Sequence, residues 1–205
     1  ALGVKHPSNP LGAVSPKVCQ DCHADEFKEV AGSIHGRRAA GDKAVKDCMG
    51  CHGSLHRVFK DGDPASPLSP INQIKTCGEC HEEMMANSER SEHARGLLKS
   101  GLVQGSPSCS SCHGKHDIRP KTDAAATTSH ARVPETCGKC HAGILREWEE
   151  SSHAKLWRTA NSGRKTSDAP VCSSCHEPHA IKRPDSAAVR DQVADRCGNC
   201  HEKVY

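Results

Sequence analysis

The chain has 205 residues, of which 35% are hydrophobic and only 2% are aromatic, and its formal net charge is +3. The near balance of acidic and basic residues excludes the lopsided charge of a disordered tail, yet the side chains are too polar to fill the interior of a domain of this length. Fourteen cysteines and fifteen histidines, far above ordinary usage, point to metal-bearing cofactors as the missing core.

All fourteen cysteines fall into C-x-x-C pairs, and a histidine directly follows each pair. In chain order these seven motifs are Cys19/Cys22/His23, Cys48/Cys51/His52, Cys77/Cys80/His81, Cys109/Cys112/His113, Cys137/Cys140/His141, Cys172/Cys175/His176 and Cys197/Cys200/His201. The pattern is the signature of c-type haem attachment, in which two thiols bind the haem vinyl groups and the adjacent imidazole is the proximal ligand of the haem iron. A disulfide framework gives no reason for the histidines, and zinc ribbons need C-x-x-C pairs in twos. The sequence therefore predicts seven covalently bound c-type haems.

This number of cofactors determines the expected fold. Each haem is served by about 29 residues (205/7), so neighbouring porphyrins are expected to lie against each other. We expect mostly irregular coil with short α-helices, wrapped around a linear array of seven covalently bound haems, with little or no β-sheet. Residues 142–160 are typical of short helices, and the Pro- and Ser-rich segments 63–70 and 121–134 are typical of irregular loops.

The motifs alternate between two types. First-type motifs begin at residues 19, 77, 137 and 197, and second-type motifs begin at 48, 109 and 172. Such a period indicates an internal repeat. We expect a single elongated multihaem domain over 1–205, built of about three and a half two-haem repeats: 19–76, 77–136, 137–196 and the half repeat 197–205.

Each complete repeat also contains two further histidines at recurring offsets, and these are candidate distal ligands of the irons. One, the +12 histidine, lies twelve residues after the proximal histidine of a first-type motif; the other, the short-offset histidine, lies three or four residues after that of a second-type motif. The +12 histidines are His35, His93 and His153, and the short-offset histidines are His56, His116 and His179. A short offset cannot cross to the opposite face of the same porphyrin, and twelve helical residues cover roughly 18 Å. Both kinds are therefore expected to reach a neighbouring haem.

Seven bis-histidine irons need fourteen imidazoles, and the two histidines outside the repeat pattern, His6 and His130, are candidates for the remaining place. Two assignments stay open. If short-offset histidines serve the first-type haem of the next repeat and +12 histidines serve the second-type haem of their own, His6 completes the first haem. The opposite assignment leaves the last haem to His130, to another subunit or to water.

Other classes of function lack their sequence signals. No window approaches the roughly 18 apolar residues of a transmembrane helix, and the aromatic platforms and basic stripe of a nucleic-acid-binding protein are missing. Because c-type haem is attached on the exported side of the bacterial membrane, we expect a periplasmic or extracellular protein whose leader has been removed.

A recurring block carries a resemblance to a known family. The block has three parts, T-C-G-x-C-H at residues 76–81, S-x-H-[GA] at 91–94 and C-x-x-C-H-G-x-H at 109–116. In this block, and over almost its whole length, the chain resembles the bacterial multihaem c-type cytochromes. The resemblance implies a soluble carrier, a component of an outer-membrane conduit, or an extracellular cytochrome that polymerises into a conducting filament. Its partners would be redox proteins or further copies of the chain.

The expected function is electron transport along closely packed bis-histidine haems in anaerobic or extracellular respiration, with the first and seventh haems as the exposed ends. The alternative is a multihaem reductase in which one open-coordinated haem is the catalytic site. The histidines are numerous enough to give every iron two imidazole ligands, and no motif has Lys in place of its proximal histidine. These two features favour a carrier that is not an enzyme.

Overall fold

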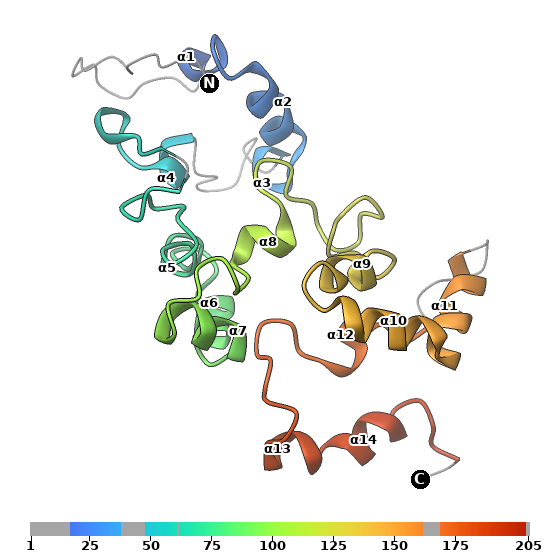
Figure 1. Cartoon of the computed structure of the whole chain (residues 1–205). Helices are drawn as coiled ribbons and strands as arrows, with labels where there is room; N and C mark the ends of the chain where they lie inside the picture. The colour runs from blue at the N-terminus through green and yellow to red at the C-terminus, as the bar shows by residue number, and fades with distance from the viewer. Residues whose placement is uncertain (1–16, 38–47, 61, 162–168, 204–205) are drawn as a thin grey trace. The chain divides into compact units, whose positions relative to one another are not determined.

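The structure is a computed structural model that describes residues 17–37, 48–60, 62–161 and 169–203. Over these ranges the chain forms short helices joined by turns and irregular backbone, and it contains no β-strand (Figure 1). Helices take up a little over half of the described residues. The prediction of short helices with little or no β-sheet is confirmed for this part of the chain, whereas the wrapping around seven haems stays a prediction.

The helices range from three to ten residues in length. In chain order they are α1 (Lys17–Gln20), α2 (Ala24–Gly32), α3 (Ile34–Arg37), α4 (Cys48–His52), η2 (Leu55–Arg57), α5 (Gln73–Gly78), α6 (Glu82–Glu89), α7 (Glu92–Ala94), the π-helical turn η3 (Arg95–Lys99), α8 (Cys109–His113), α9 (Val133–Gly138), α10 (Ala142–Glu150), α11 (Ser152–Asn161), α12 (Cys172–Cys175), α13 (Ala187–Arg190) and α14 (Val193–Gly198). No helix in the described ranges has the length and apolar character needed to cross a bilayer.

The chain divides into two compact units, each formed from two stretches of sequence. The first unit comprises residues 1–82 and 107–129, and the second comprises 83–106 and 130–205. The first four C-x-x-C-H motifs fall in the first unit and the last three in the second. The single domain with repeat boundaries at 76, 136 and 196 stays a prediction.

A serine interrupts the helical segment that follows each of the first three first-type motifs. Ser33, Ser91 and Ser151 have extended backbone, with ψ angles of 170°, 147° and 162°. The Ser91 hydroxyl accepts a hydrogen bond from the backbone N–H of His93 at 3.3 Å, as an N-cap does. The serine thus ends one helical segment and begins the next, α3, α7 or α11, whose first turn carries the +12 histidine.

Few apolar side chains are buried among the described residues. The largest of them is Leu97, which is 1% exposed, and most of the others are alanine or valine. In contrast, Ile144 is 63% exposed and Leu102 is 57% exposed. The polypeptide therefore buries few of its larger apolar side chains. The composition predicts this result.

Candidate haem sites

Each C-x-x-C-H segment forms one turn of helix. In five of the seven motifs the backbone N–H of the histidine donates to the carbonyl of the first cysteine at 2.9 to 3.0 Å, and the second and fourth motifs lie wholly within α4 and α8. Residues i, i+3 and i+4 of a helix share one face. Both thiols and the imidazole of a motif therefore lie on the same side of the turn, as attachment of one haem and ligation of its iron require.

The two cysteines of a motif differ in their exposure. The first cysteine of every motif is half-buried, whereas the second is exposed in five motifs, as Cys22, Cys80, Cys140, Cys175 and Cys200. In the motifs of α4 and α8 the second cysteines, Cys51 and Cys112, are half-buried like the first. The polypeptide thus leaves all of these predicted attachment residues at least partly accessible. Their thioether bonds to haem stay a prediction.

Glycine sets the direction of the chain after two of the second-type motifs. Gly53 and Gly114 follow the motif histidines with φ angles of +85° and +81°, in the left-handed region. In the third second-type motif Glu177 takes this position. There α12 ends at Cys175, and His176 has extended backbone with φ of −112° and ψ of 128°.

In four ring pairs of the described residues, a motif histidine faces a second imidazole at almost the same distance. The ring centres are 6.2 Å apart in His35–His81, 6.0 Å in His52–His116, 6.1 Å in His93–His141 and 6.3 Å in His153–His201. The first two pairs lie within the first unit and the last two within the second.

This distance matches the size of a bis-histidine iron centre. A bond from a metal to imidazole nitrogen is about 2 Å long, and the ring centre lies about 1 Å beyond that nitrogen. Two imidazoles on opposite faces of one iron thus have their centres about 6 Å apart. The donor set and its spacing fit a haem iron between each pair.

The ring pairs follow neither of the two assignments left open by the sequence. Each +12 histidine faces the proximal histidine of the first-type motif in the next repeat. His116 faces the second-type motif of the preceding repeat. Sequence offsets give the reach of a segment but not its direction, which here depends on the extended serine that precedes each +12 histidine.

The other candidate ligands have different surroundings. His56 lies in η2, and His113 is the last residue of α8. His130 has its Nδ1 atom buried without a hydrogen-bond partner. Within the described ranges no second imidazole faces His176, and His6 lies outside the described residues.

Burial favours the neutral form of two imidazoles in the ring pairs, His52 and His93. Burial, followed by the positive charges that His116 and His23 can carry, lowers the pKa of His52. Burial, followed by the neighbouring His141, lowers the pKa of His93. Since only the neutral imidazole can bind a metal, both environments favour the ligand form.

In two pairs of consecutive motifs, the first cysteines lie within hydrogen-bonding reach of each other. A hydrogen bond with Cys77 lowers the pKa of the Cys109 thiol, and one with Cys137 lowers that of the Cys172 thiol to about 7. The pairs place α5 against α8 in the first unit and α9 against α12 in the second. Haems attached to such motifs would have neighbouring attachment points.

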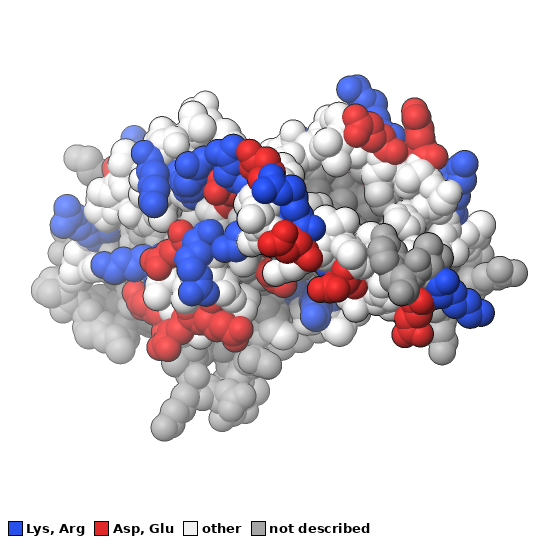
Figure 2. All heavy atoms as spheres, turned by 90° about the horizontal axis from the view of Figure 1, so that it is seen from below, with Lys and Arg blue, Asp and Glu red and all other residues white. Residues whose placement is uncertain are grey.

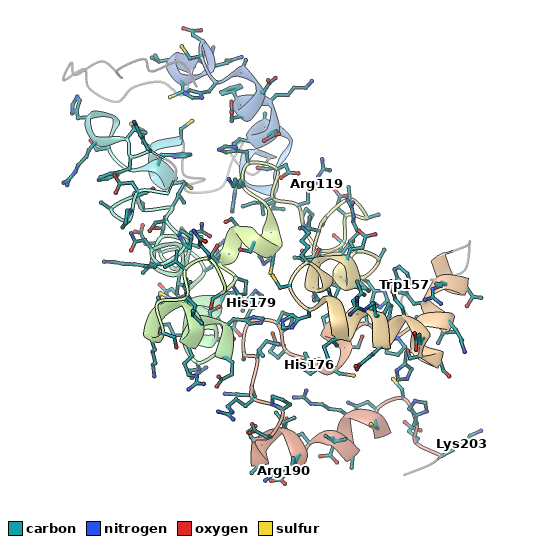
Figure 3. All side chains as sticks on the ribbon, viewed as in Figure 1. Arg119, Trp157, His176, His179, Arg190 and Lys203 are labelled. Carbon is teal, nitrogen blue, oxygen red and sulfur yellow. The ribbon has the colours of Figure 1, made fainter. Side chains whose placement is uncertain are left out.

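A cavity in the second unit lies between the fifth and sixth motifs. It encloses about 610 Å³ free of protein atoms, its open side included, and its apolar wall contains Leu145, Trp148 and Val171. Its remaining lining includes Cys137, His141, His153, Cys172, Cys175 and His176. Trp148 also packs edge-on against Trp157, whose position Figure 3 labels, with ring centres 5.6 Å apart. Thiols, imidazoles and an apolar wall in one cavity are the surroundings that a porphyrin needs.

A backbone hydrogen bond joins the segments of the +12 and short-offset histidines in both units. The N–H of Ile34 donates to the carbonyl of Ile118 at 2.8 Å, and that of Glu92 donates to the carbonyl of Ile181 at 2.9 Å. Each donor precedes a +12 histidine, and each acceptor lies two residues after a short-offset histidine. The contact fixes one candidate ligand segment against another.

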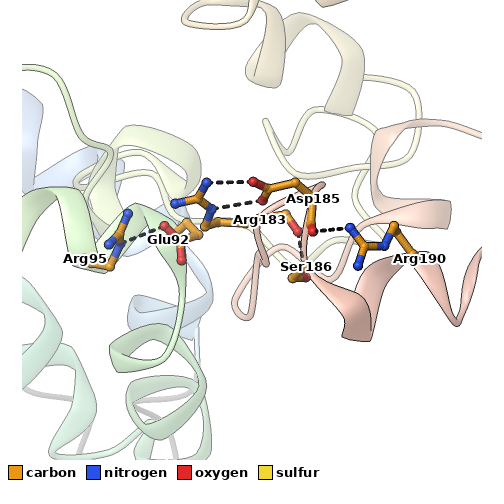
Figure 4. Close-up of polar contacts among 6 residues, drawn as sticks. All are labelled: Glu92, Arg95, Arg183, Asp185, Ser186 and Arg190. Carbon is orange, nitrogen blue, oxygen red and sulfur yellow. Dashed lines mark hydrogen bonds and ion pairs between the residues drawn. The ribbon is translucent and has the colours of Figure 1, made fainter.

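Charged side chains surround the second of these contacts (Figure 4). Arg183 donates two hydrogen bonds to the carboxylate of Asp185, at 2.9 and 2.7 Å, and Arg95 donates one to Glu92 at 2.8 Å. Arg190 donates to the carbonyl of Asp185 at 2.8 Å. The hydrogen bonds and charge of Arg183 lower the pKa of Asp185, although the pair is exposed and contributes little to stability. On the face drawn in Figure 2, basic side chains lie among acidic ones, without the continuous basic stripe of a nucleic-acid interface.

Three carboxylates near candidate ligands were not predicted from the sequence. Glu26, Glu29 and Glu177 each have an oxygen within 3.8 Å of an imidazole Nδ1 atom. Two of these glutamates are three residues apart in α2, which indicates a shared helix face. The sequence gives no sign of which imidazoles that face approaches.

One family model matches part of the chain. Residues 165–204, which include the sixth and seventh motifs, match the model of the doubled CXXCH motif. This match supports a multihaem c-type cytochrome. No curated protein matches the chain. The motifs indicate covalently bound c-type haem, and the family suggests electron transfer.

Proposed function

We propose that this chain is an electron carrier with seven c-type haems, one at each C-x-x-C-H motif, and with no substrate chemistry of its own. The observation that carries the proposal is the set of four imidazole pairs with ring centres 6.0 to 6.3 Å apart. Two imidazoles on one iron leave no position for a substrate. A bound haem supplies a one-electron couple, and the polypeptide holds it and sets its potential.

The four imidazole pairs and the seven motifs assign a role to each candidate haem-binding residue. The fourteen cysteines hold the haems, the seven motif histidines are proximal ligands, and His35, His93, His116 and His153 are distal ligands across the pairs. His56 and His179 recur in the same repeat positions, so they are the next candidates for the remaining irons, followed by His6 and His130. Ligands from neighbouring repeats would make iron coordination part of the folding energy.

Adjacent motifs support transfer between haems. The thiol contacts Cys77–Cys109 and Cys137–Cys172 bring the third and fourth attachment sites together, and likewise the fifth and sixth. Histidine as the sixth ligand, in place of methionine, favours low reduction potentials. We therefore assign the carrier to anaerobic or extracellular respiration, outside the cytoplasm, with redox proteins or further copies of the chain as partners.

Carbon monoxide binding distinguishes this function from its alternative. In the reduced, haem-loaded chain we expect low-spin spectra for the haems of the four ring pairs, and no CO adduct at those haems. A reductase with an open-coordinated haem would form a CO adduct and turn over a small substrate such as nitrite or hydroxylamine. High-spin spectra from most haems would contradict the carrier proposal.

A further inference from the structure

Helix α2 brings two carboxylates to the imidazoles of two different haem sites. A carboxylate oxygen of Glu26 lies 3.8 Å from Nδ1 of His23, the proximal histidine of the first motif. A carboxylate oxygen of Glu29 lies 3.7 Å from Nδ1 of His116, which faces His52 of the second motif. The two glutamates are three residues apart, so they lie on the same face of α2.

The position of these carboxylates has a chemical consequence. A histidine that binds a metal through one ring nitrogen offers its other N–H to a second partner, and a carboxylate there fixes the ring orientation and raises the basicity of the ligand. A negative charge close to the iron also stabilises the oxidised, more positive state over the reduced state. Both effects lower the reduction potential.

We propose that Glu26 and Glu29 are positioning residues that orient His23 and His116 and lower the reduction potentials of the first and second haems. This inference rests on the proposed function, because it takes both histidines as iron ligands. It goes beyond that function by assigning unequal potentials to the haems and by naming the side chains responsible.

The other repeats lack this arrangement of carboxylates. At the position of Glu26, α6 has Met84 and α10 has Ile144, a residue that lines the cavity of the second unit. Among the described residues, no carboxylate forms an ion pair with the imidazoles of His93–His141 or His153–His201.

One further carboxylate lies beside a candidate ligand in the second unit. Glu177 is 3.8 Å from Nδ1 of His179, and it directly follows the sixth motif rather than coming from a helix. Among the described residues, a helix that brings two carboxylates to candidate ligands, as α2 does with Glu26 and Glu29, is therefore a feature of the first repeat.

The substitution Glu29→Gln tests the proposal in the full, haem-loaded chain. An optical redox titration should show one of the seven transitions moved to a more positive potential, with the low-spin spectrum retained. Because the Glu29 side chain is 55% exposed, the substitution leaves packing intact. The shift should persist at high salt, which screens distant exposed charges much more than a contact.

Glu147→Gln is the matched control. Glu147 occupies the position in α10 that Glu29 occupies in α2, and it has no histidine partner among the described residues. No shift in either Glu29→Gln or Glu26→Gln, or an equal shift in Glu147→Gln, would overturn the proposal. The proposed function is judged separately, from the haem count and low-spin spectrum of the unsubstituted chain.

Discussion

His93 illustrates what one side chain contributes to a site assembled from two repeats. It follows the third motif by twelve residues, yet its ring faces His141 of the fifth motif, 6.1 Å away between centres. Ser91 caps the short helix that carries it, and Ala94, directly after it, is 4% exposed. The backbone of its own short helix therefore holds the His93 imidazole toward His141.

Replacing His93 with alanine should open one iron. We expect one haem of the seven to change from low spin to high spin and to bind CO when reduced, because its second imidazole is lost. Absorption and magnetic circular dichroism spectra of the oxidised and reduced protein would measure the change.

Glu147→Gln is the control, because Glu147 lies outside the ring pairs and has no histidine partner among the described residues. Its spectrum should match that of the unsubstituted protein. An unchanged low-spin spectrum in His93→Ala would show that His93 is not an iron ligand.

At the residue scale, the sequence predicts candidates better than partners. Recurring offsets single out six histidines, and the structure sets His35, His93, His116 and His153 opposite a motif histidine. Their binding to iron stays a prediction. The identity of the partner depends on chain direction after Ser33, Ser91 and Ser151, and a sequence offset contains no direction. The contact of Glu29 with His116 was missed for a related reason, since the two residues are 87 positions apart in the sequence (116 − 29).

At the scale of elements, the C-x-x-C-H turn and its terminating residue were the most predictable parts. A glycine commonly follows a helix because it accepts a positive φ, and Gly114 has φ of +81° with ψ of −170°. A Cβ atom at this position would also lie 2.9 Å from the Asp117 carboxylate. The break of the segment 142–160 into α10 and α11 was less predictable, because Ser151 can occupy a helix interior as well as an N-cap.

Gly114→Ala should destabilise the fourth motif. The backbone of Gly114, with φ of +81° and ψ of −170°, lies in a region that is almost restricted to glycine and costs another residue about 1 to 3 kcal/mol. The added methyl group also crowds Asp117. We expect a lower thermal midpoint for loss of the haem spectrum.

The reference for this measurement is Gly143→Ala. Gly143 lies in α10 with nothing within 4 Å of its added Cβ, so the change should be neutral or stabilising by up to about 1 kcal/mol. Equal midpoints for the two variants would refute the conformational argument at Gly114.

At the scale of the whole molecule, composition predicted the character of the core more securely than its arrangement. With 2% aromatic residues the chain has few large side chains to bury, and the described residues bury mainly alanine, valine and serine. The division into two compact units was not predicted. The boundaries of these units do not follow the spacing of 58 to 60 residues between first-type motifs, because α6 follows the third motif but falls mostly in the second unit.

Intact mass tests the count of haems. The matured chain should exceed its polypeptide mass by seven haem masses, because all fourteen cysteines belong to complete motifs. None of these cysteines forms a disulfide in the structure, and every one is at least partly exposed. A thiol reagent should consequently label the haem-free chain and leave the matured chain unlabelled. A mass excess of six haems or fewer in fully matured protein would disprove the count.

The ring pairs of the first unit overlap along the chain, and this has a consequence for its resistance to cleavage. His35 faces His81, and His52, which lies between them, faces His116 outside that interval. With an iron in each pair, the two segments closed by these irons, 35–81 and 52–116, would overlap along the sequence. A protease that cuts the backbone once between residues 53 and 76 would leave two fragments still joined by both irons. The nicked protein would then migrate as one species until it was denatured, and coordination in this pattern would make the chain tolerant of single breaks in its backbone.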